Sequence, residues 1–222
     1  MMPGRAWGAD SIADEGIIAG NLPGVLNAIK RSAQARELPR VALAHGWHRD
    51  IHAGVASVPA SHYLGAPRGS KHPDLEAYEV AIRDSGGRTL GEGTPARQVS
   101  GELRSFERSL RQAVGALDKQ IPPGQKPADE NELLAVIELA AIAHGEWVRI
   151  HPYANGNGRV ARIWANWVAI RYGLPPFIRI KPRPAGLLYQ QAAHESMDRP
   201  PGHRGDHTMT TKLFLDLLVN GP

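Results

Sequence analysis

Apolar side chains recur every three or four positions along most of the chain, which is the spacing of an amphipathic helix. The clearest stripe predicts a helix that starts with Thr94 as cap and Pro95 in the first turn and ends before residues 122–124. Its apolar members share one face: Val99, Leu103, Phe106, Leu110, Val114 and Leu117. A second stripe runs from residue 160, and Gly173 ends that helix ahead of a proline pair.

The rest of the pattern is also mostly helical. Residues 128–150 are apolar nearly all round, which predicts a buried central helix. Weaker patterns predict further helices over residues 10–19, 22–37, 40–55, 184–197 and 208–219. The pattern as a whole predicts a mainly α fold.

One segment has the periodicity of a strand. Large apolar residues alternate with others through residues 78–82, turn-forming residues follow at 84–87, and Thr89-Leu90 can start a returning strand. A β-hairpin and an irregular loop account for this segment about equally well, so both interpretations stay open.

Composition narrows the class of protein to a globular one. Of the 222 residues, 42% are apolar and none is cysteine, which excludes disulfides and thiolate metal sites and favours a reducing compartment. The chain starts without the pattern of a secretory signal, and 18 apolar residues nowhere run together. We therefore expect a cytoplasmic protein that does not span a membrane.

The distribution of charge is more informative than its total. The net charge of +4 is small and no nucleic-acid recognition motif accompanies it, so we expect no nucleic-acid partner. No Asp or Glu lies between Trp147 and His194. The cations in that segment are Arg149, Arg159, Arg162, Arg171, Arg179, Lys181 and Arg183. Such a segment predicts an anionic ligand.

Within this segment, residues 151–162 combine a histidine, a glycine-flanked loop and two arginines at the start of a predicted helix. The loop Gly156-Asn157-Gly158 leaves backbone N–H groups free to bind phosphate oxygens, aided by the helix dipole. Arg159 and Arg162 can reach the same face, and each guanidinium suits a phosphate. His151 can accept a proton at neutral pH. Together these residues predict phosphoryl or nucleotidyl transfer to a hydroxyl.

Three other interpretations compete with this one. The stretch can be a plain loop between helices, with solvated charged side chains. Gly156-x-Gly158-x-x-Ala161 also fits a dinucleotide-binding fingerprint, but a helix rather than a strand precedes it and no acid follows to bind a ribose. A P-loop is excluded because the sequence Gly-Lys-Ser/Thr is absent.

Residues 150–162, Ile-His-Pro-Tyr-Ala-Asn-Gly-Asn-Gly-Arg-Val-Ala-Arg, resemble the signature of the Fic family (Fic/Doc fold), His-Pro-Phe-x-Asp/Glu-Gly-Asn-Gly-Arg-x-x-Arg. The resemblance extends to residues 143–149 and 173–176, and loosely to about 40–219. It implies a helical bundle with a small β-hairpin flap, with a core domain over residues 40–222 behind an N-terminal region of residues 1–39. It also implies transfer of AMP from ATP, with Mg²⁺, to a Ser, Thr or Tyr hydroxyl of a target protein.

The resemblance also implies roles for single residues. His151 is the general base, and the strand Val80-Ala81-Ile82 pairs with the target peptide by β-augmentation. Tyr189 lies near the adenine, although it can equally be a core tyrosine. The implied nucleotide- and phosphate-binding residues are Gly156, Asn157, Gly158, Arg159, Arg162 and Tyr189.

Two positions depart from the family signature. Tyr153 replaces Phe, which the core tolerates if the hydroxyl finds a partner. Asn155 replaces the acid that ligates Mg²⁺ in the family, and Mg²⁺ prefers charged oxygens. We therefore predict a weaker dependence on magnesium, a different metal preference or a slower transfer.

Residues 11–16, Ser-Ile-Ala-Asp-Glu-Gly, resemble the family's inhibitory motif, Ser/Thr-x-x-x-Glu-Gly/Asn. The resemblance implies that Ser11 and Glu15 belong to an inhibitory helix, in which Glu15 pairs with Arg162 and takes the guanidinium meant for the γ-phosphate. A capped, solvated helix end is the plainer alternative.

The leading hypothesis is thus a self-inhibited protein adenylyltransferase that can also modify itself. The alternatives are transfer of another phosphate-containing group, and a catalytically weak nucleotide-binding or interaction module. The sequence does not identify the target protein, the base of the donor nucleotide or the oligomeric state, and a homodimer is one possibility. It also does not say whether the protein removes the modification.

Overall fold

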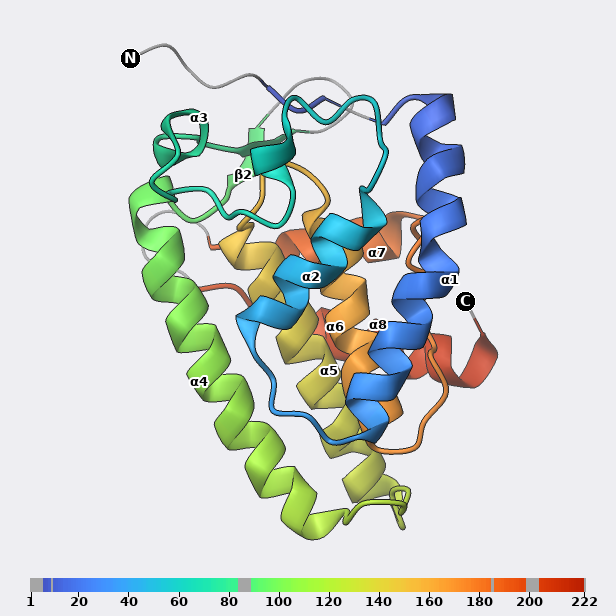
Figure 1. Cartoon of the computed structure of the whole chain (residues 1–222). Coiled ribbons are helices and arrows are strands. Elements are labelled where there is room, and N and C mark those ends of the chain that lie inside the picture. Colours follow the sequence, from blue (N-terminus) through green and yellow to red (C-terminus); the bar gives the residue numbers. More distant parts are fainter. Residues whose placement is uncertain (1–5, 9, 84–88, 185, 199–203, 222) are drawn as a thin grey trace.

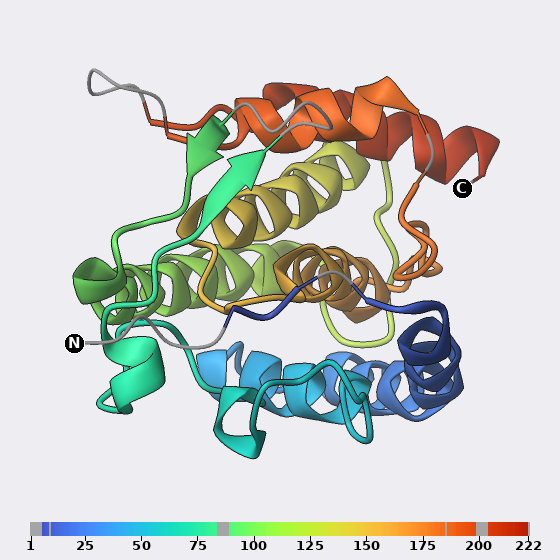
Figure 2. The same ribbon diagram turned by 90° about the horizontal axis from the view of Figure 1, so that it is seen from above.

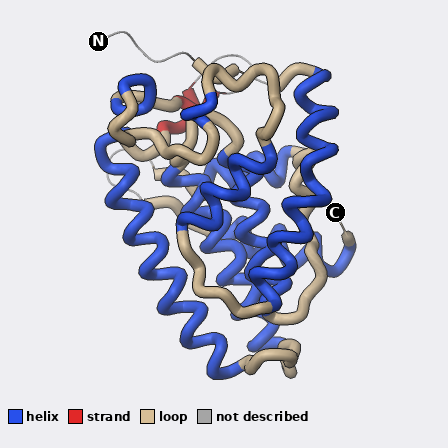
Figure 3. Tube along the Cα trace, viewed as in Figure 1, coloured by secondary structure: helices blue, strands red, loops and turns tan. Residues whose placement is uncertain are grey.

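The computed structural model of the chain describes residues 6–8, 10–83, 89–184, 186–198 and 204–221, and these are mainly helical (Figure 1, Figure 3). The predicted fold class is therefore confirmed. The helices are α1 (Ile12–Gln34), α2 (Val41–Ile51), α3 (Pro73–Glu76), α4 (Ala96–Gln120), α5 (Glu130–Ile150), α6 (Asn157–Arg171), α7 (Leu187–Glu195) and α8 (Thr208–Asn220). A 3-10 turn, η1 (Ser61–Tyr63), and the strands β1 (Ala81–Arg83) and β2 (Thr89–Glu92) complete these elements.

The pair of helices α5 and α6 forms the centre of the bundle. Helices α7 and α8 lie on the α5 side, whereas α1 and α2 cover α6 from the opposite side (Figure 2). Every residue of α6 except Gly158 is buried, while α5, predicted to be the buried central helix, exposes Leu134 and Ile142. Among the helices that the structure describes, none combines the length and the apolar character needed to cross a membrane.

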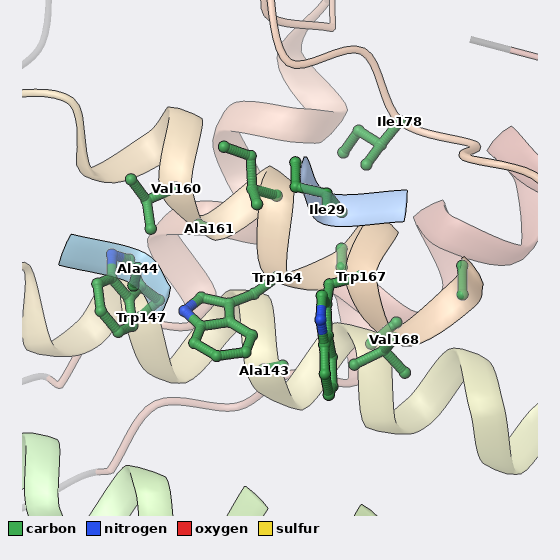
Figure 4. Close-up of a cluster of buried hydrophobic side chains, with 14 of the residues drawn as sticks. Ile29, Ala44, Ala143, Trp147, Val160, Ala161, Trp164, Trp167, Val168 and Ile178 are labelled. Carbon is green, nitrogen blue, oxygen red and sulfur yellow. The ribbon is translucent and has the colours of Figure 1, made fainter. Parts of the chain in front are cut away.

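Tryptophans fill the middle of the core (Figure 4). Trp147 of α5 and Trp164 of α6 are fully buried. The Trp164 ring centroid lies 4.8 Å from that of Trp47 on α2 and 5.5 Å from that of Phe106 on α4. Rings of this kind bury about 150–250 Å² each. The Trp147 ring centroid lies 6.0 Å from that of Trp164, so four helices meet at the Trp164 ring. Trp147 also lies 5.8 Å from Tyr153, which belongs to the loop that carries the motif.

The two helices predicted over residues 10–19 and 22–37 are one continuous helix, α1, with Pro23 inside it. Proline usually interrupts a helix because it has no N–H to donate. Here α1 buries Ile18 before the proline and Val25 and Ile29 after it in the main core, which holds the helix together across that position. The proposed domain boundary at residue 39 stays a prediction.

The hairpin is the correct one of the two interpretations for the strand-like segment. Strands β1 and β2 pair antiparallel, with Ala81 opposite Glu92 and Ile82 opposite Gly91, and the register shifts after Ile82. The predicted turn at residues 84–87 lies outside the described residues.

The prediction that Thr94 caps α4 is wrong. The first amide of the helix, Ala96 N–H, donates instead to the Glu79 carboxylate at 3.0 Å. The Thr94 carbonyl accepts a hydrogen bond from Arg68 at 2.8 Å. Glu79 lies just before β1, in the part of the chain that we call the hairpin stem (residues 78–80 and 93–94). No local pattern of residues predicts a cap from that distance.

Candidate active site

The loop between α5 and α6 is fixed from inside by its own side chains. The buried Asn157 side chain accepts a hydrogen bond from the Tyr153 N–H and donates one to the Tyr153 carbonyl, both at 2.8 Å. The Tyr153 ring is fully buried, and its hydroxyl lies 2.8 Å from His45 Nδ1. The Tyr153 hydroxyl, which a phenylalanine would lack, therefore has the hydrogen-bond partner that its burial requires.

The start of α6 has the features of an anion site. Gly156 adopts a φ of 81°, a conformation that favours glycine, and a Cβ there would lie 2.5 Å from the His52 ring. The first N–H groups of a helix have no partner within it, so those of Asn157 and Gly158 can bind an anion. The positive end of the helix dipole favours negative charge at the same place.

Two histidines support this loop, His48 in α2 and His52 at the C-cap of α2, and the sequence analysis did not single them out. His48 Nδ1 accepts a hydrogen bond from Gly65 N–H at 2.9 Å, so Nε2 carries the proton that is donated to the Asn155 carbonyl at 3.0 Å. Burial lowers the pKa of His48 well below its usual value, which keeps the ring neutral. His52 lies one turn further on and backs Gly156. The sequence did hold a signal for them, because His45, His48 and His52 are spaced so that they share one helical face.

His151 ends α5 in the left-handed conformation, with a φ of 51°. Its Nδ1 lies 3.1 Å from the Val148 carbonyl, which places the proton on Nδ1 and leaves the lone pair on Nε2. Burial, assisted by the positive charge of Arg68, lowers the pKa of His151 to about 4. The ring is therefore neutral at pH 7 and able to accept a proton.

Arg68 is a residue of the site that sequence reasoning missed. Its side chain is fully buried and joins the hairpin stem to the end of α5 and the loop that follows it. It donates to the carbonyls of His151 (2.9 Å), Tyr78 (3.0 Å), Thr94 (2.8 Å) and Ile150 (3.3 Å). An unpaired buried carbonyl costs about 1–3 kcal/mol, so this guanidinium holds several otherwise unfavourable groups in place. A lone arginine in a polar loop carries no signal of such a role.

The hairpin stem lies directly beside His151. A Cβ at Gly93 would lie 2.9 Å from His151 Cβ and 2.8 Å from Val80 Cγ2, so only glycine fits there without a shift. The Gly93 N–H donates to the Val80 carbonyl at 3.2 Å. Residues 80–82 of the predicted flap therefore begin next to the candidate base.

Arg159 and Lys181 bind a carboxylate of the chain itself. Asp10, which precedes α1, pairs with Arg159 and lies 3.2 Å from Lys181 Nζ. Burial raises the pKa of Asp10, but the hydrogen bonds and charges of Arg159 and Lys181 outweigh it, and the pKa is lowered. A carboxylate of the chain thus binds the Arg159 guanidinium, which the sequence analysis expected to bind phosphate.

The segment around Asp10 is tied across the motif at two further points (Figure 2). Asn155 Nδ2 donates to the Gly8 carbonyl at 2.7 Å, and Trp7 N–H donates to the Tyr78 hydroxyl at 3.1 Å. The Trp7 ring is buried, with its centroid 5.0 Å from that of His52. We call residues 7, 8 and 10 the N-terminal strap.

The predicted pair between Glu15 and Arg162 is wrong for this structure. Arg162 is buried and donates to the Ile180 carbonyl from Nε (3.1 Å) and Nη2 (2.6 Å) and to the Tyr189 hydroxyl (2.8 Å). Glu15, whose side chain is 56% exposed, lies 3.2 Å from Lys181 Nζ instead. The Tyr189 hydroxyl also lies 3.0 Å from His144 Nε2, so Tyr189 positions Arg162, and its contact with adenine stays a prediction.

The reason for this difference is local. Ser11 is the N-cap of α1, and its hydroxyl accepts from Asp14 N–H while the Asp14 carboxylate binds Ser11 in return. This capping box starts the helix at Ile12. Asp10 lies just before the cap and pairs with Arg159, whereas Glu15 lies in the first turn and is largely exposed. Ser11 is therefore a helix cap, as the plainer alternative predicted, and an inhibitory role for it stays a prediction.

Much of the basic segment that predicted an anionic ligand is neutralised from elsewhere in the chain. Arg149 pairs with Glu102, Glu146 and Asp198. Arg171 pairs with Asp118. The absence of acids in the sequence between residues 147 and 194 therefore does not mean that its cations are free.

The magnesium ion that the family resemblance implies does not fit these residues. Asn155 Oδ1 accepts a hydrogen bond from Gly156 N–H at 2.6 Å, and the amide offers no charge. The neighbouring carboxylate, Asp10, is paired with two cations. Because Mg²⁺ prefers charged oxygen ligands, this donor set does not suit a magnesium ion held by the protein.

Comparisons with known proteins find relatives that match the part of the chain that contains this loop. Residues 75–169 match the model of the Fic/DOC family. Similar curated proteins are "Protein adenylyltransferase Fic" of Nematostella vectensis (41% identical over 70 residues), "Protein adenylyltransferase fic-1" of Caenorhabditis elegans (49% over 51 residues) and "Uridine 5'-monophosphate transferase" of Xanthomonas campestris (32% over 68 residues). These segments cover 31%, 22% and 31% of this chain, and only 16%, 10% and 13% of the relatives.

Solved structures extend the likeness to nearly the whole chain. A Fic domain-containing signalling protein from Bacteroides thetaiotaomicron matches with a TM-score of 0.64 at 19% identity, over 96% of this chain and 69% of that one. Fic-1 from C. elegans matches with a TM-score of 0.58 at 22% identity, over 98% of this chain and 51% of that one. At such identities the likeness shows a shared fold. This chain therefore carries a Fic/DOC family domain over residues 75–169.

Proposed function

We propose that the protein transfers AMP from ATP to a hydroxyl side chain of a target protein. The observation that carries this proposal is the position of His151, neutral and with Nε2 free, at the start of the loop that leads to the anion site of α6. A base beside a polyphosphate site is what nucleotidyl transfer to a hydroxyl requires. The names of the similar curated proteins agree with this proposal.

The proposed step uses only residues of this chain. The target hydroxyl oxygen attacks the α-phosphorus of ATP and its proton passes to His151 Nε2. The bond from the α-phosphorus to the bridging oxygen breaks, and pyrophosphate leaves. The N–H groups of Asn157 and Gly158, with Arg159, stabilise the charge that develops on the phosphate oxygens. Arg162 meets the γ-phosphate if its bonds to Ile180 and Tyr189 are rearranged.

The target is proposed to bind at the hairpin. The stem lies beside His151, and an edge strand offers backbone groups to an extended peptide. Residues 80–82 would then bring a Ser, Thr or Tyr hydroxyl of the target, or of a second copy of this chain, towards the base. A loop of this chain that reaches the site would be modified in the same way.

The direct test uses two forms of labelled ATP. Label on the α-phosphate is expected to appear on protein, while label on the γ-phosphate is not. The reverse result would indicate phosphoryl transfer. Because one similar protein is named a uridine 5'-monophosphate transferase, labelled UTP is the second donor to test. Nucleotide binding without transfer of any label would leave a binding module as the function.

Self-inhibition is proposed to act through Asp10 rather than Glu15. The Asp10 carboxylate is bound by Arg159 and Lys181, so the strap and the phosphates of ATP compete for the same cations. Asn155 contributes by binding the Gly8 carbonyl, which an aspartate there would not do. The strap must therefore leave for the nucleotide to bind in full.

The pH profile is a further prediction of this mechanism. Because His151 must be neutral to accept the proton and its pKa is lowered to about 4, kcat/KM should stay on its plateau at pH 5. An imidazole with the ordinary value of about 6.5 would be only about 3% neutral there. An acid limb near pH 6.5, with the fold intact by circular dichroism, would contradict the neutral, buried base.

The metal dependence is predicted to change with one residue. We expect the wild type to respond weakly to added Mg²⁺ and Asn155→Asp to gain transfer activity over the same titration, because the new carboxylate is a magnesium ligand. Asn155→Ala is the matched control, since it also loses the bond to Gly8 but adds no charge. Superimposable curves for wild type and Asn155→Asp would contradict the prediction.

A further inference from the structure

We propose that His62, His72 and Asp74 form a binding site for a zinc-class divalent cation, separate from the proposed active site. Each residue offers one ligand atom, and the three atoms all lie within 4.8 Å of one another. His62 belongs to η1, His72 is the N-cap of α3, and Asp74 lies in the first turn of α3. Two short elements thus present their polar side chains to one point.

The ligand set indicates the kind of ion. Two imidazole nitrogens with one carboxylate oxygen suit zinc and its neighbours, whereas magnesium and calcium prefer oxygen alone. The side chains of His62, His72 and Asp74 are 27%, 40% and 39% exposed. Solvent can therefore reach the site and supply a water as the fourth ligand.

The contacts among the three residues leave ligand capacity unused. His62 Nε2 lies 2.9 Å from Asp74 Oδ2, yet it is buried and makes no hydrogen bond within the described part of the chain. His72 Nδ1 lies 3.9 Å from the same oxygen and accepts only a long bond, 3.3 Å, from the Asp74 N–H. A cation between these atoms would satisfy the buried nitrogen and the carboxylate together.

Binding requires a small rearrangement. The two imidazoles are stacked, with centroids 3.4 Å apart and planes at 18°, so their lone pairs lie in two nearly parallel planes and do not point at one shared position between the rings. A tetrahedral zinc ion with bonds of about 2.0–2.1 Å needs ligand atoms roughly 3.3 Å apart and lone pairs that converge. The rings must turn apart about their side-chain torsions, and their exposure leaves room for this.

The expected effect of the ion is structural. It would link η1 to α3, and residues of both elements, Tyr63 and Leu75, form a small core with Trp7 of the strap. The chain between η1 and α3 also carries Arg68, which holds the carbonyl of His151. A bound ion would therefore stiffen the support of the catalytic loop without entering the chemistry.

The test measures zinc itself on the untagged, full chain after removal of metal with EDTA. We expect one equivalent of zinc by elemental analysis and by calorimetry, with a higher melting temperature in its presence. His62→Gln and Asp74→Asn should each weaken binding at least about tenfold. Glu76→Gln, an exposed carboxylate on the same helix, is the matched control and should bind as the wild type does.

Either of two results would overturn the proposal. One is a wild-type chain that retains no zinc, and the other is equal binding by wild type and His62→Gln. If a variant fails to fold, zinc-edge X-ray absorption on the wild type identifies the ligands of the bound ion. Two imidazoles and oxygen at about 2.0–2.1 Å are expected, and a shell without two imidazoles rules this site out. None of these measurements depends on transferase activity.

Discussion

Replacement of His151 by alanine is expected to lower the rate of AMP transfer by a factor of about 10²–10⁴, the usual contribution of a general base. In the proposed mechanism Nε2 of His151 accepts the proton of the target hydroxyl, since its Nδ1 is bound to the Val148 carbonyl. The measurement is transfer of α-labelled phosphate to protein under saturating ATP.

His151→Asn is the matched variant for this experiment. Its side-chain amide can still donate to the Val148 carbonyl in place of Nδ1, but it provides no base. We expect a loss as large as that in His151→Ala, with nucleotide affinity changed little in both, because the N–H groups of α6 and Arg159 are untouched. Wild-type transfer by His151→Asn would show that His151 positions the loop and is not the base.

Replacement of Asp10 by asparagine is expected to tighten ATP binding by about tenfold and to raise self-modification. The carboxylate of Asp10 competes with phosphate for Arg159 and Lys181, and removing its charge shifts the population towards the open strap. A tenfold change corresponds to about 1.4 kcal/mol, which is modest for a charge-assisted pair that is mostly shielded from water. Calorimetry with ATP measures the affinity directly.

Glu15→Gln separates this proposal from the family's inhibitory motif. Glu15 is largely exposed and reaches only Lys181 among the cations of the site, so its replacement should have a smaller effect than that of Asp10. The opposite order, with Glu15→Gln activating more than Asp10→Asn, would indicate that α1 moves and that Glu15 reaches Arg162 in solution. Equal affinities in all three proteins would contradict control by the strap.

The proposed base and the strap both contact the loop between α5 and α6, so the proposed catalysis and the proposed inhibition are linked. Asn155 follows His151 by four residues, donates to the strap at Gly8, and receives support from His48 through its own carbonyl. A substitution that releases the strap can therefore also shift the loop that holds His151. This is why nucleotide affinity and transfer rate have to be measured separately in every strap variant.

The sequence predicted more of the fold than of the site. Helix periodicity located α2, α4, α5, α6, α7 and α8, because a stripe of apolar residues on a helix must face a core. It divided α1 at Pro23, since the burial of residues on both sides of the proline is a tertiary fact. The same limit applies to the cap of α4, which comes from Glu79, seventeen residues away.

For the site, the sequence by itself determined what lies within one loop: His151 at the end of a helix, the glycines at the next helix start, and Arg159 in its first turn. Spacing along a helix fixes such neighbours. Only the tertiary structure decided which distant charge meets which cation. Asp10 rather than Glu15 pairs with Arg159, and Arg162 binds the Ile180 carbonyl, because pairing over such sequence distances depends on how the helices pack.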